Sequence, residues 1–295
     1  AAARKPAVGS TLAAPRVPRR GRRVSPGSDA AGPGSAPTVA RAPIPQPPFW
    51  GSRRAKGIPL GDYLPFLDKR ALFEARWGLK EGLSGLSVRE LAATQGEPRL
   101  AALLDQVRQE GLAVPQVAWG HFPVRRDGDA VAVLDSPSWD AGERARFTFP
   151  RQADGYRRCL ADYVDPEAVD VLALQVVTMG PKFTEATARL FAGDDYRSYL
   201  ELHGLAVELA EALAEATQRR IAGGLGLEDG RGRRYSFGYP ACPDLGQRRI
   251  LFDLLDAEQI GLTMTDGDLL EPEQSTDALV FHHPQATYFN VRKAE

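Results

Sequence analysis

The sequence predicts an α+β protein in which helices flank an antiparallel β-sheet. Strand-like and helix-like stretches do not alternate regularly along the chain, which argues against a doubly wound α/β fold. Asp127-Gly128 separates two stretches of alternating apolar and polar residues and is a strong hairpin signal. The apolar, β-branched stretch VDVLALQVVTMG at 169–180 predicts a central strand of the sheet.

The first part of the chain differs from the rest in charge and proline content. Residues 1–57 contain eleven Lys or Arg and one acid, Asp29, so their charge is about +10, whereas the whole chain carries −1. Ten of the 23 prolines also lie there. Such a stretch cannot bury enough apolar surface to offset the entropy of ordering, so we predict a disordered linker over 1–46 and a folded domain over 47–295. The alternative is a nucleic-acid arm around RRGRR at 19–23, but no aromatic residues interleave with these arginines.

Composition argues against several classes of protein. No apolar run approaches the roughly 20 residues needed to span a bilayer, and the N-terminus has no apolar signal-peptide core. Cys159 and Cys242 are too few for a disulfide framework, which suits a reducing cytoplasm. We therefore expect a cytoplasmic protein that binds neither membrane nor nucleic acid. Because the chain begins with Ala1, we also expect a piece of a longer polypeptide or a processed product.

Helices and strands can be assigned in order along the predicted domain. Ser87 and Glu90 have capping-box spacing, and Gly111 is typical of the residue after a helix. Asp68 lies beside the apolar stripe of the first predicted helix, where a surface position or a local hydrogen bond is its ordinary role. The expected helices cover 61–76, 88–95, 98–110, 184–222 (with a possible break at Gly193-Asp194-Asp195) and 245–258, and the expected strands cover 116–124, 129–134, 144–149, 169–180, 260–265, 278–284 and 286–291.

The long predicted helix carries an acidic row. Glu208, Glu211 and Glu215 follow one another at spacings of three and four, so at least part of the row shares one side of the helix, and we expect a solvated face. The glycine-rich stretch 223–233 that follows lacks both GxxxxGK[ST] and a strand-to-helix GxGxxG. We therefore assign it no nucleotide-binding role.

The stretch RYSFGYPACPD at 234–244 is the most unusual in the chain. Pro240 and Pro243 exclude a helix interior or a paired strand, and Gly238 permits a positive φ. Arg234 at the entrance could hold a small anion, although a stiff structural turn explains the same residues equally well.

Other catalytic and metal-binding patterns are missing from the sequence. There is no nucleophile elbow and no HExxH. His282 and His283 are adjacent, so on a strand they point to opposite faces, and His121 and His203 have no ligand partner at metal-binding spacing. We expect structural roles for all four.

RYSFGYPACPD resembles the RxxxGYPACP signature of the C-terminal activation domain of cobalamin-dependent methionine synthase. The resemblance extends in order over nearly the whole predicted domain, from Phe49 to Val291. The similar segments are PFWGSR (48–53), CLADYVDP (159–166), VLALQVVTMG (171–180), YLELHGLAVELAEALAE (199–215), LLDAEQIGLTMT (254–265) and PEQSTDALVFHHPQATYF (272–289).

This resemblance implies a fold and a function. The family fold is a helmet-like twisted antiparallel sheet flanked by helices. The family domain binds S-adenosylmethionine and caps the cobalamin-binding domain after the cobalamin has been oxidised to cob(II)alamin. An electron from flavodoxin or a similar reductase, with a methyl group from S-adenosylmethionine, then regenerates methylcobalamin. The implied partners are thus the cobalamin-binding domain and the electron donor, and the implied role lies in methionine biosynthesis.

The resemblance also implies site residues. Arg234 aligns with the arginine that holds the ligand carboxylate, and Asp68 with an aspartate that accepts from the ammonium. Tyr288 and Phe289 align with the aromatic pair that lines the ligand. Tyr239 and the backbone at Ala241 are expected to shape the pocket and face the corrin, Glu211 to lie near the active methyl group, and Glu228 to match a further family acid.

The resemblance leaves two alternatives and several missing parts. The chain could be a free-standing methyltransferase for another acceptor, although the expected glycine loop is missing, or a docking module for flavodoxin or the cobalamin domain without its own ligand. The sequence has no DxHxxG cobalamin motif, no cysteine set for the zinc of a homocysteine domain and no folate barrel. We therefore expect zinc only in a domain outside this chain, and we do not expect this chain alone to make methionine.

Overall fold

A seven-stranded antiparallel sheet is the centre of the fold in the computed structural model, which describes residues 39–81, 85–153, 155–228 and 231–291. Six strands follow the order β4-β3-β2-β5-β9-β6, and β1 pairs with β2. The predicted linker lies outside the described residues up to position 38, and its remaining part, 39–46, is irregular. The strands are β1 (Gly51–Lys56), β2 (Gln116–Asp127), β3 (Ala130–Leu134), β4 (Glu143–Thr148), β5 (Asp170–Thr178), β6 (Arg233–Tyr235) and β9 (Ser275–Phe281), with a separate pair β7 (Thr263–Met264) and β8 (Leu270–Glu271).

The predicted hairpin and central strand are both present. Asp127 pairs with Ala130, so Gly128 and Asp129 form the turn between β2 and β3, one residue later than the sequence suggested. Gly128 has a φ of +60°, which a two-residue hairpin turn favours. β5 is buried along its whole length and pairs with β2 and β9, as expected for a central strand. The α+β fold with an antiparallel sheet is therefore confirmed.

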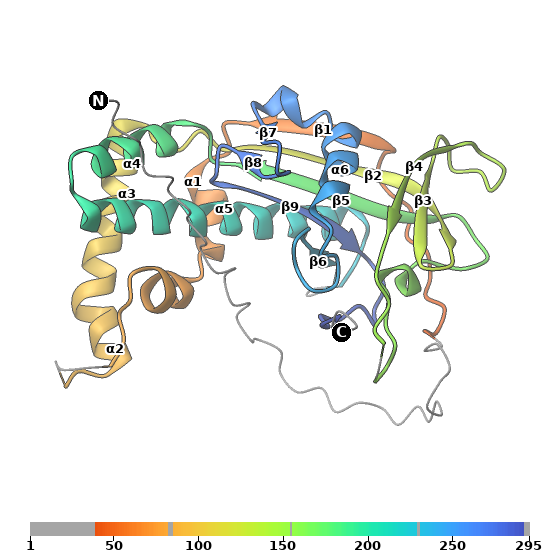
Figure 1. Cartoon of the computed structure of the whole chain (residues 1–295), viewed down its shortest axis with the longest axis horizontal. Coiled ribbons are helices and arrows are strands. Elements are labelled where there is room, and N and C mark those ends of the chain that lie inside the picture. The colour runs from red at the N-terminus through yellow and green to blue at the C-terminus, as the bar shows by residue number, and fades with distance from the viewer. Residues whose placement is uncertain (1–38, 82–84, 154, 229–230, 292–295) are drawn as a thin grey trace, which may run out of the picture. The chain divides into compact units, whose positions relative to one another are not determined.

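The 29-residue helix α5 lies along one face of the sheet (Figure 1). Leu205, Leu209 and Leu213 pack in the same core as Val171 and Ala173 of β5. α4 and α5 replace the single predicted helix, and they are separated where the sequence suggested a break, at Gly193–Asp195. The helices on this side are α1 (Leu60–Tyr63), the 3₁₀ helix η1 (Leu64–Phe66), the π-helices η2 (Ala71–Arg76) and η3 (Ala92–Gly96), α2 (Val88–Leu91), α3 (Glu97–Glu110), α4 (Lys182–Ala192) and α5 (Tyr196–Gly224).

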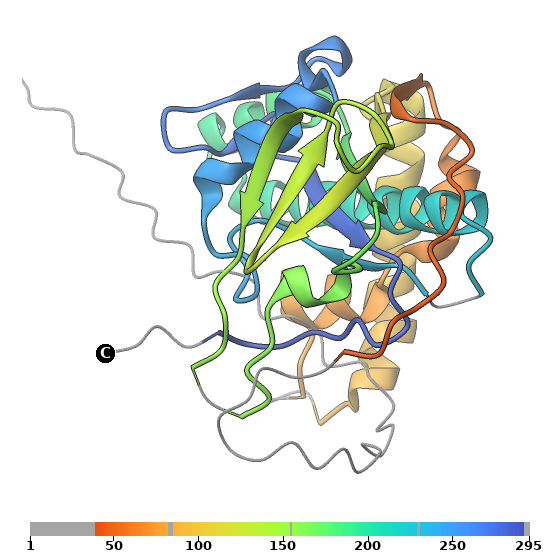
Figure 2. The same ribbon diagram turned by 90° about the vertical axis from the view of Figure 1, so that its right-hand side faces the viewer.

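The opposite face of the sheet carries a second core, and helices lie on both sides of the sheet (Figure 2). Leu172 and Leu174 alternate with the residues of β5 that face α5, so the strand supplies both cores. α6 packs here through Leu251 and Phe252. The helices on this side are η4 (Leu160–Tyr163), η5 (Leu245–Gln247), α6 (Arg248–Leu254) and η6 (Ala257–Ile260). Among the described residues, no helix is both long enough and apolar enough to cross a membrane.

The first predicted helix, 61–76, is wrong as a single element. The chain forms α1, then η1, and becomes helical again at Lys69, directly before η2. Pro65 lies in the first turn of η1, and Leu67 then takes an extended ψ of 121°. Asp68 accepts hydrogen bonds of 3.0 Å from the backbone N–H groups of Arg70 and Ala71, so it starts the next helical segment. Apolar spacing detected the buried face but not this interruption.

Near the C-terminus, two further predictions need correction. The helix expected over 245–258 ends at Leu254 because Asp256 adopts a φ of +49°, and η6 follows. Residues 286–291 form no strand. The Tyr235 hydroxyl donates to the Thr287 carbonyl at 2.8 Å, so a side chain holds this segment in place of a ladder of backbone hydrogen bonds.

Candidate ligand-binding site

Within the predicted stretch 234–244, residues 236–242 follow β6 and form a loop that closes on itself, called the ligand loop below. The N–H of Gly238 donates to the carbonyl of Cys242, and the N–H of Cys242 donates to that of Tyr239, both at 2.9 Å. Gly238 has a φ of +87°, and a Cβ there would lie 3.0 Å from Leu245 Cδ2. Any other residue would be strained in backbone and in contact, so the loop requires glycine at this position.

Arg234 extends from β6 towards the acidic row of α5. Its Nη2 lies 3.5 Å from Glu211 Oε2 and 3.8 Å from Glu215 Oε2. The Arg234 side chain is 18% exposed and that of Glu211 is 42% exposed. Charge-assisted hydrogen bonds are usually about 2.7–2.9 Å long. Neither acid therefore holds the guanidinium tightly, and it remains able to bind a further anion.

The acidic row is only partly solvated, so the sequence expectation is wrong for Glu208. This residue is buried, and its Oε1 accepts a 2.8 Å hydrogen bond from Nε of Arg76 in η2. Burial raises the pKa of Glu208, and Arg76 opposes that effect. Gly204 allows this approach, because a Cβ there would lie 2.8 Å from Arg76 Cβ. Helical spacing identified the side that the acids share but not the segment that covers it.

Tyr239 joins the same cluster from the ligand loop. Burial raises the pKa of its hydroxyl, Glu211 raises it further, and Arg76 and Arg234 lower it. The side chain is partly exposed and makes no hydrogen bond within the described ranges. Ala241 lies apart from it, buried in the core on the other face of the sheet. The structure therefore brings Tyr239, but not the Ala241 side chain, to Arg234 and Glu211.

Asp68 lies at the border of the cluster, and Glu228 pairs with an arginine outside it. The Asp68 carboxylate is close enough to Glu208 to raise the pKa of that buried acid, but its Oδ1 is already used as a helix cap. Glu228 is exposed and lies 3.6 Å from Nη2 of Arg231. In the part of the chain that the structure describes, Glu228 has no contact with Arg234.

Tyr288 and Phe289 lie on the other side of β6. The ring centroid of Tyr288 is 5.5 Å from that of Tyr235, and Phe289 packs against the core on that face. Tyr235 and Arg234 are neighbours on one strand, so their side chains point to opposite faces of the sheet. The aromatic pair and Arg234 are thus separated by β6, which is the last strand of the sheet.

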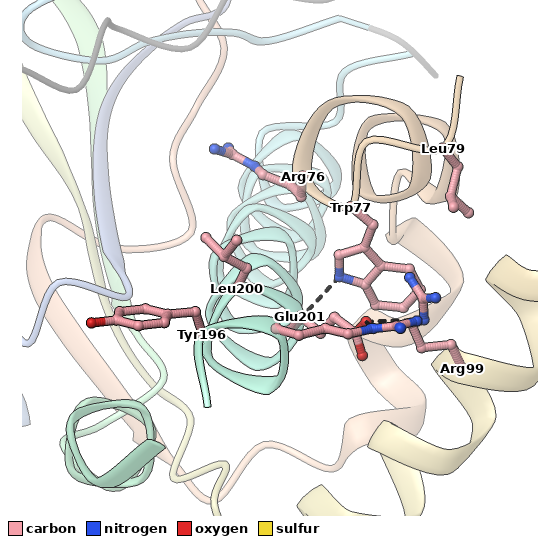
Figure 3. A pocket seen from close by; sticks show the side chains of 8 residues that line it. Arg76, Trp77, Leu79, Arg99, Tyr196, Leu200 and Glu201 are labelled. Carbon is pink, nitrogen blue, oxygen red and sulfur yellow. Dashed lines mark hydrogen bonds and ion pairs between the residues drawn. The ribbon is translucent and has the colours of Figure 1, made fainter. Parts of the chain in front are cut away.

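An open pocket of about 440 Å³ lies next to Arg76. Figure 3 shows residues of η2, α3 and α5 around it. Nε1 of Trp77 donates to the Glu201 carbonyl at 3.0 Å, and Arg99 Nε lies 3.3 Å from Glu201 Oε1. Sequence reasoning did not find this pocket, because its walls are about a hundred residues apart in the chain.

Sequence reasoning also missed a buried ion pair beneath the ligand loop. Oδ2 of Asp277 on β9 accepts a hydrogen bond from Nε of Arg248 on α6. Their side chains are 0% and 11% exposed, respectively. The available signal was the position of Asp277 directly before the apolar stretch ALVF of β9, since a buried carboxylate requires a partner.

Three of the four histidines have partners typical of structural residues. His282 Nε2 lies 2.7 Å from Asp170 Oδ1, and both side chains are buried. His283 Nε2 lies 2.9 Å from the Ala40 carbonyl, and His203 pairs with Glu273 at 3.1 Å. The described ranges hold no cluster of His, Cys, Asp and Glu suited to a metal ion.

Comparisons with known proteins agree on one family. Residues 64–295 match the family model described as the vitamin B12 dependent methionine synthase, activation domain. The chain is 44% identical over 277 residues to the methionine synthases of Mycobacterium leprae and Mycobacterium tuberculosis, and each alignment covers 84% of the chain. The chain spans only 23% of the length of these relatives. A crystal structure of the MetH reactivation domain bound to AdoHcy has the same fold, with a TM-score of 0.74, 22% identity and coverage of 88% of this chain and 85% of that one.

Proposed function

This chain belongs to the family of activation domains of vitamin B12 dependent methionine synthases, and from that premise we propose that it binds S-adenosylmethionine and serves to remethylate cobalamin held by a neighbouring domain. The observation that carries the proposal is Arg234. Its guanidinium is one-fifth exposed and lies more than 3.4 Å from both nearby acids, so it can exchange these loose contacts for a bidentate bond to a ligand carboxylate.

The groups around Arg234 fit the charges of S-adenosylmethionine. That ligand carries a carboxylate, an ammonium, a sulfonium and an adenosine. Arg234 would bind the carboxylate, and Glu211 and Asp68 would face the ammonium and the sulfonium. Glu211 is 42% exposed and therefore reachable from solvent. The structural relative was solved with AdoHcy bound, which supports a ligand of this class.

Tyr288 and Phe289 would complete the site around the edge of the sheet. Because β6 is the last strand, a ligand that lies along this edge can contact residues of both faces. Tyr288 is 59% exposed, and an aromatic face is favourable next to a sulfonium cation. Tyr239 and the backbone at Ala241 would form the wall that faces the corrin.

The reaction requires groups that other domains and proteins supply. When bound, S-adenosylmethionine supplies the methyl group, and the cobalamin of the neighbouring domain accepts it after reduction by flavodoxin or a similar electron donor. The residues of this chain hold and orient the ligand. Both cysteines are free and buried, which suits a reducing compartment such as the cytoplasm.

Titration calorimetry tests the binding step directly. We expect heat of binding when S-adenosylmethionine is added to the wild-type chain, and a loss of affinity of about a hundredfold in Arg234→Ala, because a charged hydrogen-bonded pair is removed. Arg231→Ala is a matched control, because Arg231 is an exposed arginine that pairs with Glu228. The absence of heat with the wild type would refute the proposal and favour the alternative, a docking module without its own ligand.

Two acid substitutions test how the ligand cation is recognised. Glu211→Gln should lower the affinity for S-adenosylmethionine more than the affinity for AdoHcy, because AdoHcy has no sulfonium charge. For the ammonium, Asp68→Asn should lower the affinity for S-adenosylmethionine, and Asp62→Asn is the control that should leave it unchanged. Asp62 is exposed, and its carboxylate makes no hydrogen bond within the described residues, whereas Asp68 caps a helix. Loss of affinity only in Asp62→Asn would move the ammonium contact to α1.

The methyl-transfer step needs a second experiment. With an added cobalamin domain and a reductant, we expect the absorption spectrum of cob(II)alamin to change to that of methylcobalamin only when S-adenosylmethionine is present. Binding without this conversion, together with methylation of a different acceptor, would instead support a free-standing methyltransferase.

A further inference from the structure

Arg248 and Asp277 lie directly beneath the ligand loop. Asp277 Oδ1 accepts a hydrogen bond of 3.3 Å from the N–H of Phe237, and the Asp277 carbonyl accepts one of 2.6 Å from the Ser236 hydroxyl. The thiol of Cys242 donates to the Ser236 carbonyl at 2.9 Å. The start of the loop is thus joined to β9, and its end is joined back to its start.

Arg248 extends the same network in two directions. Beyond its ion pair with Asp277, it donates to the carbonyl of Asp268 in the turn between β7 and β8, and to the carbonyl of Phe237 at 3.5 Å. A guanidinium offers several donors in a fixed plane, so one side chain can hold three acceptors at fixed relative positions. α6, β9 and the ligand loop therefore meet at Arg248.

Stability alone gives little reason for such a pair. Transferring both charges into the interior carries a desolvation cost, and replacing a buried ion pair by apolar side chains of similar size is often neutral or stabilising. The Asp277 side chain is 0% exposed, so the cost is at its greatest here. The pair also holds backbone groups of the one loop that carries Tyr239.

We infer that Arg248 and Asp277 are positioning residues that hold loop 236–242, and with it Tyr239, in the conformation that receives S-adenosylmethionine. This inference rests on the function proposed above. Neither side chain is placed to contact the proposed ligand. Asp277 is fully buried, and Arg248 is nearly buried and directs its guanidinium to the carbonyl of Phe237. Their effect reaches the ligand through the N–H and the carbonyl of Phe237, which bond to Asp277 and Arg248, respectively.

The test separates positioning from stability with a double variant of the full chain. Arg248→Met/Asp277→Leu removes both charges and introduces apolar side chains of similar length, so we expect a midpoint of thermal unfolding close to that of the wild type. The Kd for S-adenosylmethionine, measured by calorimetry, should rise about tenfold. A double variant that binds within threefold of the wild type overturns the inference, and any larger increase supports it.

A second variant keeps the test decisive if the double variant does not fold. Arg248→Lys retains the charge beside Asp277 but has no planar fork for the three acceptors. We expect an increase in Kd of at least threefold with little change in the unfolding midpoint. An unchanged Kd in this variant would overturn the inference on its own.

A matched control and the wild type distinguish the possible failures. Arg126 pairs with the buried Asp162 at 2.6 Å, with exposures of 23% and 1%, and touches no residue of the ligand loop. Arg126→Met should lower the unfolding midpoint and leave the Kd unchanged. If the wild type itself gives no heat with S-adenosylmethionine, the proposed function fails and this inference fails with it. If the wild type and the double variant bind equally, only the inference fails.

Discussion

One arginine–carboxylate pair has its arginine before the ligand loop in the chain, and a second pair has its arginine after it. The two pairs have the same chemistry but differ in burial and in the number of hydrogen bonds that the arginine makes. Arg248 and Asp277 are 11% and 0% exposed, and the arginine has three protein acceptors. Arg234 and Glu211 are 18% and 42% exposed and lie 3.5 Å apart. Arg248 uses three of its five N–H donors on protein acceptors, whereas Arg234 uses one, for Glu211. The number of protein acceptors, more than the charge, distinguishes the arginine that supports the loop from the arginine that can bind.

The largest expected effect comes from breaking the buried pair on one side. Asp277→Asn leaves Arg248 charged in the interior without a counter-ion, so the free energy of unfolding should fall by about 3–5 kcal/mol. Glu211→Gln makes the same change in the exposed pair and should cost less than about 1 kcal/mol. Urea unfolding of both variants measures the difference. Equal losses would contradict the distinction drawn between the two pairs.

A buried titratable group without an ion-pair partner extends the comparison. His121 is buried, and both of its ring nitrogens lack hydrogen-bond partners among the described residues. Burial, and then the charge of Arg53, lower the pKa of His121 to about 4. In the unfolded chain its pKa is about 6.5, so the unfolded state binds the extra proton between these values. This group therefore stabilises the fold above pH 6.5, and its contribution is lost as the pH falls to 4.

The expected loss is about 3 kcal/mol in the free energy of unfolding between pH 6.5 and pH 4. Urea titrations of the wild type and of His121→Leu across this range isolate the contribution, because all other groups titrate in both. The free energy of unfolding of the wild type should fall relative to that of the variant as the pH approaches 4. Parallel curves would show that folding does not lower the pKa of His121.

A conservative substitution at Arg234 tests whether the exposed pair contributes to ligand binding more than to stability. Lysine keeps the charge but cannot make two parallel hydrogen bonds to a carboxylate. Arg234→Lys should therefore raise the Kd for S-adenosylmethionine about tenfold, which corresponds to about 1.4 kcal/mol of binding free energy. The free energy of unfolding should change little. Calorimetry and urea unfolding on the same preparation check both parts. A large loss of stability would mean that Arg234 resembles Arg248 in role.

Local signals in the sequence were sufficient for much of the fold. The strand at 169–180, the hairpin after β2 and the helix that ends at Gly111 all depend on residues close together in the chain. The unusual composition of 234–244 also marked the loop that the structure places beside Arg234 and Glu211. These features are set by periodicity, by glycine and by proline, which a single sequence displays.

The parts that sequence could not predict depend on distant residues. Arg76 and Glu208 are 132 positions apart, so nothing near Glu208 indicated that η2 would bury it. Arg248 and Asp277 are 29 positions apart, and no local pattern around either residue identified its partner. Pro65 was visible, but its effect on the first helix depends on the extended backbone at Leu67. The roles of individual site residues remain predictions, because they require a ligand.

The smallest expected effect concerns the start of the domain, which the sequence placed at residue 47. Arg41 lies before that boundary, yet its Nε and Nη2 donate to both oxygens of the nearly buried Asp165, at 2.8 and 3.0 Å. Arg41 itself is 57% exposed, so solvent screens this pair and Arg41→Ala should shift the unfolding midpoint only slightly. A chain that begins at residue 47 also loses the bonds of Ala40 to His283 and Gln285, which precede Tyr288. It should therefore bind S-adenosylmethionine more weakly than Arg41→Ala does, whereas equal affinities would place the functional boundary at 47.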